Sequence, residues 1–285
     1  MTRWYWLSLV ALAASQTGCG RFGDGGTAPL TALPIQRDQA PNGVVVIAHR
    51  GDSKLAPENT LSAFHSAVAG GADYVELDSR VSTDGTIWCW HDKDMDRTSD
   101  AVKVLGREKI PFAEMSDADL AKLDAGAWFD PRFVGERVAR LDAALDVIQA
   151  GSITLLERKT GSAKAHVDVL RAKGLLGRLI VQAFDWKFLA DLHALEPDQI
   201  MAALGDKVID DARWDELAKT GVRIIAWNFQ DTTPEMITEA RRRGYRFWVW
   251  TVDEPADWDR MLVAGVDGII TNRPRDLIAH MRSKS

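Results

Sequence analysis

From Val44 onward, the chain alternates short apolar runs with longer segments whose apolar residues recur at helical spacing. The short runs are rich in Val, Ile, Leu and Trp, as parallel strands buried on both faces are. Strands that alternate with helices in this way indicate an α/β fold built on a parallel sheet. We expect eight strands: Val44–His49, Asp73–Asp78, Thr86–His91, Ile153–Glu157, Leu179–Phe184, Ile200–Leu204, Arg223–Asn228 and Arg246–Thr251.

The segments between these runs carry helix signals. Leu61, Phe64 and Val68 form an apolar stripe behind a capping residue at position 59 or 60. The segments Pro234–Gly244 and Pro255–Gly265 begin with proline and end with glycine, as helices often do. A (β/α)8 TIM barrel usually takes roughly 250 residues. The 285-residue chain with this alternation is therefore predicted to form a single TIM barrel.

Two features interrupt the alternation. Only a hairpin-like turn, Ser82–Gly85, separates the second and third runs, which leaves no room for a helix. After the third strand, about residues 93–140 form an excursion that a barrel can carry as a small insertion. A doubly wound open sheet is the alternative architecture. It requires a glycine-rich phosphate loop after a strand, and the sequence contains none.

The N-terminus differs from the rest of the chain. Arg3 precedes an apolar run at residues 4–14, which has the length of a signal h-region and is short for a membrane span. Gly18-Cys19 then resembles a lipoprotein cleavage site, so residues 1–19 are predicted to be a leader with membrane attachment through Cys19. Ordinary secretion is the alternative. Both interpretations predict export, to the periplasm or as a membrane-anchored lipoprotein.

The leader sets the remaining domain boundaries and the role of the cysteines. Residues 20–42 are rich in Gly, Pro, Thr and Ala, which is typical of a flexible tether. Residues 43–285 are left for the barrel. If Cys19 carries lipid, Cys89 has no cysteine partner, which excludes a disulfide framework. We interpret Cys89 as a small buried apolar residue.

Polar residues cluster where the expected strands end. Barrel enzymes place their catalytic groups at the C-terminal ends of strands. Four consecutive ends with His, carboxylate and cationic side chains are hard to explain by solvation alone. These ends are His49-Arg50-Gly51-Asp52, Glu76-Leu77-Asp78, His91-Asp92 and Glu157-Arg158-Lys159, and a fifth reads Gln182-Ala183-Phe184-Asp185.

Three of these residues are acidic. Glu76 and Asp78 are two apart on one strand and therefore point to the same face. Adjacent carboxylates repel unless one is protonated or a cation lies between them. With Glu157 from the fourth strand they offer three oxygen ligands, which suit one divalent cation, Mg²⁺ or Ca²⁺. The alternative is pairing with neighbouring cations, namely Arg80, Arg158 or Lys159.

His49 and His91 come from different strand ends, and imidazole can take or give a proton near neutral pH. Cleavage of a phosphodiester requires both transfers. Arg50 can bind two phosphate oxygens at once, and Lys159 adds a point charge, although Lys159 can also pair with Glu157. The net charge of −6 leaves no broad basic field. A small-molecule phosphodiester is therefore expected as the partner, and nucleic acid is not.

The ordered motifs together resemble the glycerophosphodiester phosphodiesterase family over almost the whole span from Val44 to Leu277. Each motif is weakly specific and the ordered set is highly specific. The set is His49-Arg50-Gly51, Pro57-Glu58-Asn59-Thr60, Glu76-Leu77-Asp78, Thr83-Asp84-Gly85, His91-Asp92, Ala127-Trp128-Phe129, Gly135-Glu136-Arg137, Glu157-Arg158-Lys159, Val181-Gln182-Ala183-Phe184-Asp185, Val249-Trp250-Thr251-Val252 and Gly265-Val266-Asp267-Gly268-Ile269-Ile270-Thr271-Asn272-Arg273-Pro274.

The resemblance implies a barrel with a small insertion and a hydrolase that releases glycerol 3-phosphate and an alcohol. It implies the same metal, acid-base and phosphate-binding residues as above. It adds Glu58 as a ligand or orienting group, with a turn-and-cap role as the alternative. Gln182 and Trp250 would line the site, unless they only pack. Asn272 stands where many relatives have Asp, and Asp253 replaces part of a more usual Asn-containing turn.

Two other functions stay open at this point. A lysophospholipid or another phospholipid-derived diester would suit the same site, and apolar residues of the insertion such as Trp128, Phe129 and Phe133 would favour it if they are exposed. Those aromatic residues can equally form the insertion's own core. A non-catalytic surface binding protein is the second alternative. It predicts the loss of a His, acid or Lys at the site, and the sequence shows no such loss.

Overall fold

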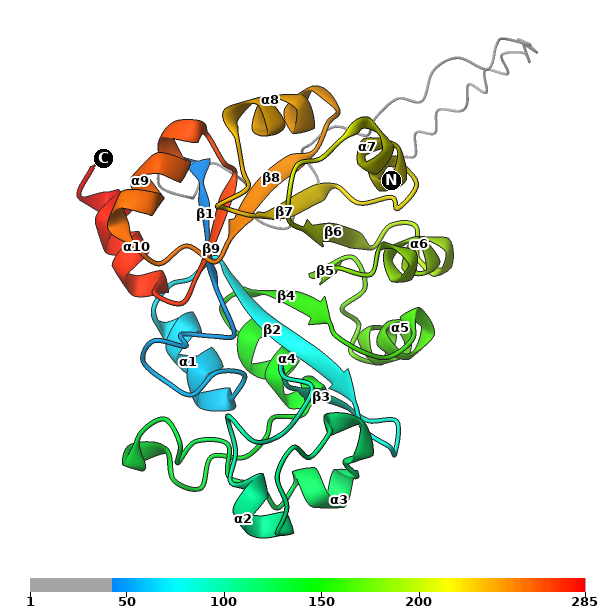
Figure 1. The fold of residues 1–285 in the computed structure, drawn as a ribbon, viewed down its shortest axis with the longest axis vertical. Coiled ribbons are helices and arrows are strands. Elements are labelled where there is room, and N and C mark those ends of the chain that lie inside the picture. Colours follow the sequence, from blue (N-terminus) through cyan, green and yellow to red (C-terminus); the bar gives the residue numbers. More distant parts are fainter. Residues whose placement is uncertain (1–42, 285) are drawn as a thin grey trace, which may run out of the picture.

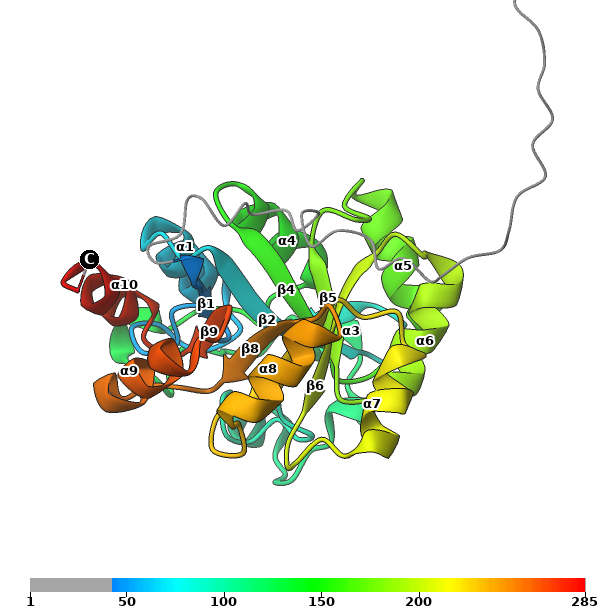
Figure 2. The same ribbon diagram turned by 90° about the horizontal axis from the view of Figure 1, so that it is seen from above.

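The computed structural model describes residues 43–284. Eight parallel strands form a closed barrel, because the first strand pairs with both the second and the last. The helices surround these strands, as the two views in Figures 1 and 2 show. This is the predicted (β/α)8 TIM barrel.

The predicted leader, the tether and Cys19 lie outside the described residues. No helix within residues 43–284 has the length and apolarity needed to cross a membrane.

The elements follow one another in β/α order, except that no helix separates the second and third strands and an insertion follows the third. The strands are β1 (Val45–Ala48), β2 (Tyr74–Val81), β3 (Ile87–Cys89), β4 (Ile153–Arg158), β5 (Ile180–Ala183), β6 (Ile200–Gly205), β7 (Ile224–Asn228), β8 (Arg246–Trp250) and β9 (Gly268–Thr271). The helices are α1 (Leu61–Ala69), α2 (Ala101–Leu105), α3 (Asp117–Leu120), α4 (Leu141–Gln149), α5 (Ala163–Ala172), α6 (Trp186–Leu195), α7 (Asp211–Ala218), α8 (Pro234–Arg242), α9 (Pro255–Ala264) and α10 (Pro274–Arg282).

The number of barrel strands agrees with the prediction, but one member of the set differs. The run predicted at 86–91 gives β3, which pairs antiparallel with β2 outside the ring. The short turn before it permits only an antiparallel partner, since parallel neighbours need a longer crossover. The eighth ring strand is instead β9, which pairs in parallel with β1 and β8. Only four residues long, β9 lies in a segment that was not predicted to be a strand.

Side chains alternate across the barrel wall and form two apolar cores. Val45 and Ile47 of β1 point into the barrel with Tyr74, Leu155 and other inward residues. The intervening residues face outward and pack against the helices. A fully packed interior leaves room for polar chemistry only beyond the last apolar layer, at the C-terminal ends of the strands.

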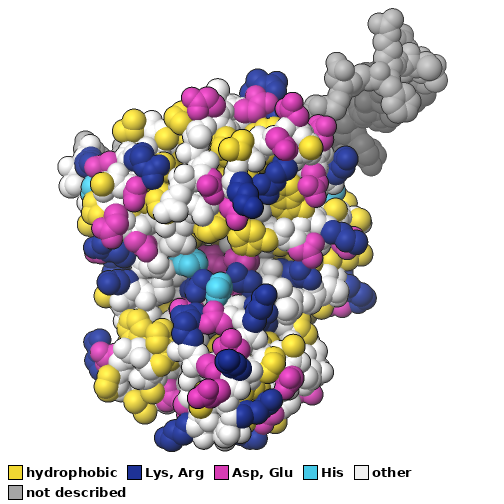
Figure 3. Space-filling model, in the orientation of Figure 1, with side chains coloured by type: hydrophobic (Ala, Val, Ile, Leu, Met, Phe, Trp, Pro, Cys, Tyr) yellow, Lys and Arg dark blue, Asp and Glu magenta, His cyan; other side chains and the backbone are white. Residues whose placement is uncertain are grey.

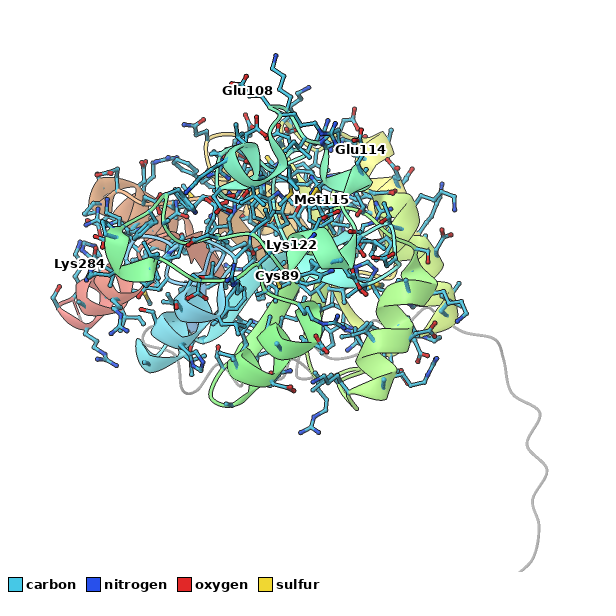
Figure 4. The ribbon with its side chains drawn as sticks, turned by 90° about the horizontal axis from the view of Figure 1, so that it is seen from below. Cys89, Glu108, Glu114, Met115, Lys122 and Lys284 are labelled. Atoms are coloured by element: carbon cyan, nitrogen blue, oxygen red, sulfur yellow. The ribbon has the colours of Figure 1, made fainter. Side chains whose placement is uncertain are left out.

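The segment between β3 and α4 folds into an insertion with its own core. It contains α2, α3 and two short 3₁₀ helices, Phe112–Glu114 and Pro131–Phe133. Its apolar core includes Trp90, Met95 and Phe112, all buried. The predicted buried role of Cys89 is confirmed, because this free thiol is fully buried. Figure 4 shows Cys89 inside the molecule, whereas Glu108 projects from the insertion into solvent.

Candidate active site

The strand alternation explains how the polar side chains reach one place. Several lie an even number of residues after a side chain of the barrel interior. His49, Glu157 and Gln182 come two residues after Ile47, Leu155 and Ile180. Glu76 and Asp78 come two and four residues after Tyr74. In the β2–β4 register Asp78 lies opposite Glu157. Figure 3 shows histidine side chains near the centre of this face, surrounded by acidic and basic ones.

Glu76, Asp78 and Glu157 form a buried acidic cluster, with one oxygen of each within 4.8 Å of the others. Arg50 Nε lies 3.3 Å from Asp78 Oδ2, and Lys159 Nζ lies 3.1 Å from Asp78 Oδ1. Lys159 also pairs with Glu157. The ion-pair alternative is therefore realised for Lys159. Arg80 instead donates to the His91 carbonyl, and Arg158 pairs with Asp185.

The cluster has more negative charge than its neighbours neutralise. Among the described residues, Glu76 Oε1 has no hydrogen-bond partner although it is buried. Burial, followed by the charges of Asp78 and Glu157, raises the pKa of Glu76 well above its ordinary value. Burial and Asp78 also raise the pKa of Glu157 to about 7. A buried carboxylate oxygen without a partner, in an all-oxygen donor set, fits a hard divalent cation.

His49 and His91 lie in the same cavity but have different partners. His49 Nδ1 lies 2.7 Å from Asn272 Oδ1, and His91 Nδ1 lies 2.7 Å from Asp92 Oδ1. An amide oxygen only accepts, so Nδ1 of His49 is the protonated nitrogen and Nε2 keeps its lone pair. Burial and the charge of Arg50 lower the pKa of His49 to about 4. Burial lowers the pKa of His91 as well, although Asp92 opposes that shift.

The loop after β1 places Arg50 beside the acidic cluster. Its amide nitrogen donates to Glu76 Oε2 over 2.7 Å, and its Nη1 donates to Glu58 Oε1 over 2.8 Å. The backbone turns sharply here, with φ of 55° at Arg50 and 85° at Gly51. A Cβ at Gly51 would lie 2.7 Å from the Ala63 carbonyl carbon, so only glycine fits.

The cavity between these groups has a volume of about 110 Å³ and is lined by both polar and apolar side chains. Gln182 and Trp250 both line it, as the family resemblance implied. Trp250 donates its Nε1 proton to the Ala226 carbonyl and meets Phe184 edge to face at 5.6 Å. Phe184 remains half exposed. The cavity lining therefore combines an aromatic pair with charged side chains.

The sequence reasoning missed three residues that hold these groups. Asn59 Nδ2 donates to Asp78 Oδ2 over 2.7 Å, and Asn59 Oδ1 accepts from the Asp78 amide, yet the sequence suggested Asn59 only as a helix cap. Thr60 is the cap instead. Asp253 accepts from the side chain and the backbone of Asn272. Arg97 bridges Glu58 and Asp92. No motif identified in the sequence contains Arg97, so its place beside the site could not be predicted.

Comparisons with known proteins identify the family. The model of the glycerophosphoryl diester phosphodiesterase family matches residues 49–276. A glycerophosphodiester phosphodiesterase of Caldanaerobacter subterraneus is 30% identical over 84% of this chain and 98% of its own. One from Bacillus subtilis is 29% identical over 86% of this chain and 89% of its own.

Solved structures show the same likeness. A phosphodiesterase of Oleispira antarctica, in complex with the product sn-glycerol-3-phosphate, superposes with a TM-score of 0.76 at 26% identity, covering 84% of this chain and 96% of its own. A glycerophosphodiester phosphodiesterase of Agrobacterium tumefaciens gives a TM-score of 0.71 at 30% identity, covering 83% and 99%. The motifs, the barrel and its relatives agree, and the chain belongs to the glycerophosphoryl diester phosphodiesterase family, whose members are phosphodiester hydrolases.

Proposed function

We propose that this enzyme hydrolyses glycerophosphodiesters to glycerol 3-phosphate and an alcohol, using one divalent cation and the pair His49 and His91. The observation that carries the proposal is the buried Glu76–Asp78–Glu157 cluster with its unpaired Glu76 oxygen. Arg50 and Lys159 contact this cluster, and both line one cavity with Glu157 and the two histidines. Mg²⁺ and Ca²⁺ both suit an all-oxygen set. When bound, the cation would neutralise the phosphodiester charge and polarise its oxygens.

Arg50 and Lys159 bind the phosphate in this proposal. Both line the cavity, and their side chains are largely buried by the carboxylates they contact. The planar Arg50 guanidinium can donate to two phosphate oxygens, whereas Lys159 supplies a point charge. These groups hold the phosphorus between His49 and His91, which also line the cavity.

The different partners of the histidines support a proposal for their separate roles. His49 Nε2 is neutral and removes the proton from the hydroxyl next to the phosphate ester on the glycerol. That hydroxyl oxygen then forms a bond to phosphorus. The bond to the alcohol oxygen breaks, and this oxygen takes a proton from His91, whose imidazolium form Asp92 favours. Water then opens the cyclic phosphate with the roles reversed: His91 accepts the water proton, and His49 returns a proton to the glycerol oxygen.

The cavity supports a small substrate. At about 110 Å³ it suits a glycerophosphate group, while the alcohol group lies toward the half-exposed Phe184. Exposed apolar side chains on the insertion favour a second candidate, a lysophospholipid or related diester, because an acyl chain would need an apolar surface outside the cavity. Trp128 is 39% exposed and Val134 is 66% exposed. The first candidate rests on the site itself and is preferred.

A panel of diesters tests both parts of the proposal. The purified enzyme is assayed on sn-glycero-3-phosphocholine and on lysophosphatidylcholine, each with Mg²⁺, Ca²⁺ or a chelator. We expect turnover of the glycerophosphodiester with an added cation, loss on chelation and slower turnover of the lysophospholipid. Activity that survives thorough chelation would contradict the proposed requirement for a divalent cation. Faster turnover of lysophosphatidylcholine would favour the second candidate.

A further inference from the structure

Arg97 of the insertion connects two parts of the site that are far apart in the sequence. Its Nη1 and Nη2 donate to the two Glu58 carboxylate oxygens over 2.8 and 2.7 Å. Its Nε donates to Asp92 Oδ2 over 2.6 Å, and its Nη2 also donates to Asp92 Oδ1 over 3.1 Å. One guanidinium therefore binds two carboxylates, each through two hydrogen bonds, which is the geometry that fixes direction most strongly.

The backbone on either side of Arg97 is fixed by the insertion's own fold. Met95 is fully buried in the insertion core, and its amide donates to the Ile110 carbonyl. Thr98 is buried on the other side. Asp96 accepts from the amide of Lys109. The guanidinium is thus presented from a rigid support, although its side chain is 46% exposed.

The contacts of Arg97 extend to the reacting groups in both directions. Toward the barrel, Glu58 also accepts from Arg50 Nη1 over 2.8 Å. Toward β3, Asp92 Oδ1 contacts His91 Nδ1 over 2.7 Å. Charges alternate along this chain of contacts, so each carboxylate lies between two partners. Loss of the central cation would leave two neighbouring carboxylates without their shared partner.

We propose that Arg97 is a positioning residue, which clamps Asp92 against Glu58 and so holds the His91 imidazole in the orientation needed to protonate the leaving alcohol. This inference rests on the proposed role of His91 as the general acid. It also gives the insertion a function, because Arg97 belongs to the insertion and contacts both Glu58 and Asp92. Exposed ion pairs contribute little to stability. The effect of Arg97 is therefore expected in turnover rather than in folding.

Two substrates with different leaving groups distinguish positioning of His91 from a purely structural role, because a structural defect would slow both substrates alike. Choline leaves as an alkoxide and needs a proton, whereas p-nitrophenolate is a stable anion and leaves without one. We compare turnover of sn-glycero-3-phosphocholine with that of the p-nitrophenyl ester of glycerol 3-phosphate. Arg97→Ala is expected to lower kcat on the choline ester by about tenfold to a hundredfold, part of a general acid's ~10²–10⁴-fold contribution. On the nitrophenyl ester the rate of the first step, measured as nitrophenolate release in a single turnover, should change less than about threefold, because His91 acts as a base only in the second step.

Conservative replacement and rescue sharpen the result. Arg97→Lys should recover only part of the rate, because a single ammonium cannot bind both carboxylates in the same forked geometry. Millimolar guanidinium should restore activity to Arg97→Ala. The matched control is Arg107→Ala, which breaks an exposed ion pair with Glu114 elsewhere in the insertion and should leave both rates unchanged. An equal loss on both esters, or no loss on the choline ester, would overturn the proposal.

His91→Ala is assayed on both esters in the same experiment. If His91→Ala loses the choline ester selectively and Arg97→Ala does not, the inference about Arg97 alone has failed. If His91→Ala shows no selective loss, the general-acid assignment itself has failed, and the inference fails with it. The two failures are therefore distinguishable by which variant departs from expectation.

Discussion

His49 and His91 each place Nδ1 2.7 Å from a side-chain oxygen, but one oxygen belongs to an amide and the other to a carboxylate. His49 lies at the end of a ring strand, and its partner Asn272 is itself held by Asp253. His91 lies beyond the extra strand β3, and its partner Asp92 is held by a cation of the insertion. In the proposed mechanism, the charge of this partner is what makes His49 the base and His91 the acid.

Removal of each imidazole tests this comparison most directly. His49→Ala and His91→Ala should each lose more than about a hundredfold of kcat on sn-glycero-3-phosphocholine, because each acid or base contributes roughly 10²–10⁴-fold. On the activated nitrophenyl ester, nitrophenolate release in a single turnover should remain impaired only in His49→Ala, since the first attack still requires a base and His91 acts as a base only in the second step. Turnover is measured at saturating cation. Near wild-type rates in His49→Ala on either ester would contradict its role as the base.

Asn59 offers a variant that should affect both histidines alike, because it holds the carboxylate of Asp78, whose charge acts on both imidazoles. Asn59→Gly keeps the positive φ of 58° without strain and removes the side chain. Loss of such an orienting partner typically weakens metal affinity by about 10–100-fold. The cation concentration for half-maximal activity should rise accordingly for both esters, with the rate recovered at high cation. An unchanged cation dependence would show that Asn59 does not position the cluster.

The sequence predicted the barrel and most of the site because both are local patterns. Strand and helix periodicity is visible in short windows, and His49, Glu76 and Glu157 lie at strand ends that a barrel brings together. The motifs that carry the family resemblance also occur in the order expected along the chain. The same alternation that buries Ile47 directs His49 into the cavity, so fold and site follow from one periodicity.

What the sequence did not predict depends on partners that are distant along the chain. Glu58 and Arg97 are 39 residues apart, and His49 and Asn272 are 223 apart, so no local pattern marks either contact. The exchange of β3 for β9 in the ring has the same origin. A short strand such as β9 gains its place by pairing with β1 and β8 rather than by its own propensity.

The amide next to His49 can be exchanged for a carboxylate without changing the net charge. The double variant Asp253→Asn with Asn272→Asp moves the carboxylate onto His49 Nδ1. A carboxylate at this distance favours the imidazolium and should raise the pKa of His49 from about 4 by about 1–3 units. The base is active when neutral, so kcat/KM falls as pH drops through this pKa. The acidic limb of the profile should therefore move to higher pH.

The single variant Asn272→Asp is the informative control for that exchange. Asn272 Nδ2 donates to Asp253 Oδ2 over 2.6 Å, so the new carboxylate would meet another at contact distance. Two carboxylates in contact cannot both ionise easily, so the melting temperature of the protein should fall. If the double variant leaves the acidic limb where it was, the partner of His49 does not set its protonation.

The converse exchange, Asp92→Asn, makes the partner of His91 neutral and should give the smallest effect. Although burial opposes it, hydrogen bonds from Arg97 and His91 lower the pKa of Asp92 to about 2, so Asp92 is ionised at any working pH. Its loss removes a charge that favours imidazolium, and the pKa of His91 should fall. The acid is active when protonated, so kcat/KM falls as pH rises through this pKa, and the alkaline limb should move to lower pH. His91 and Asp92 are 32% and 21% exposed, so solvent screens the pair and the shift should be about one unit or less. A shift of the alkaline limb to higher pH would contradict the role of Asp92.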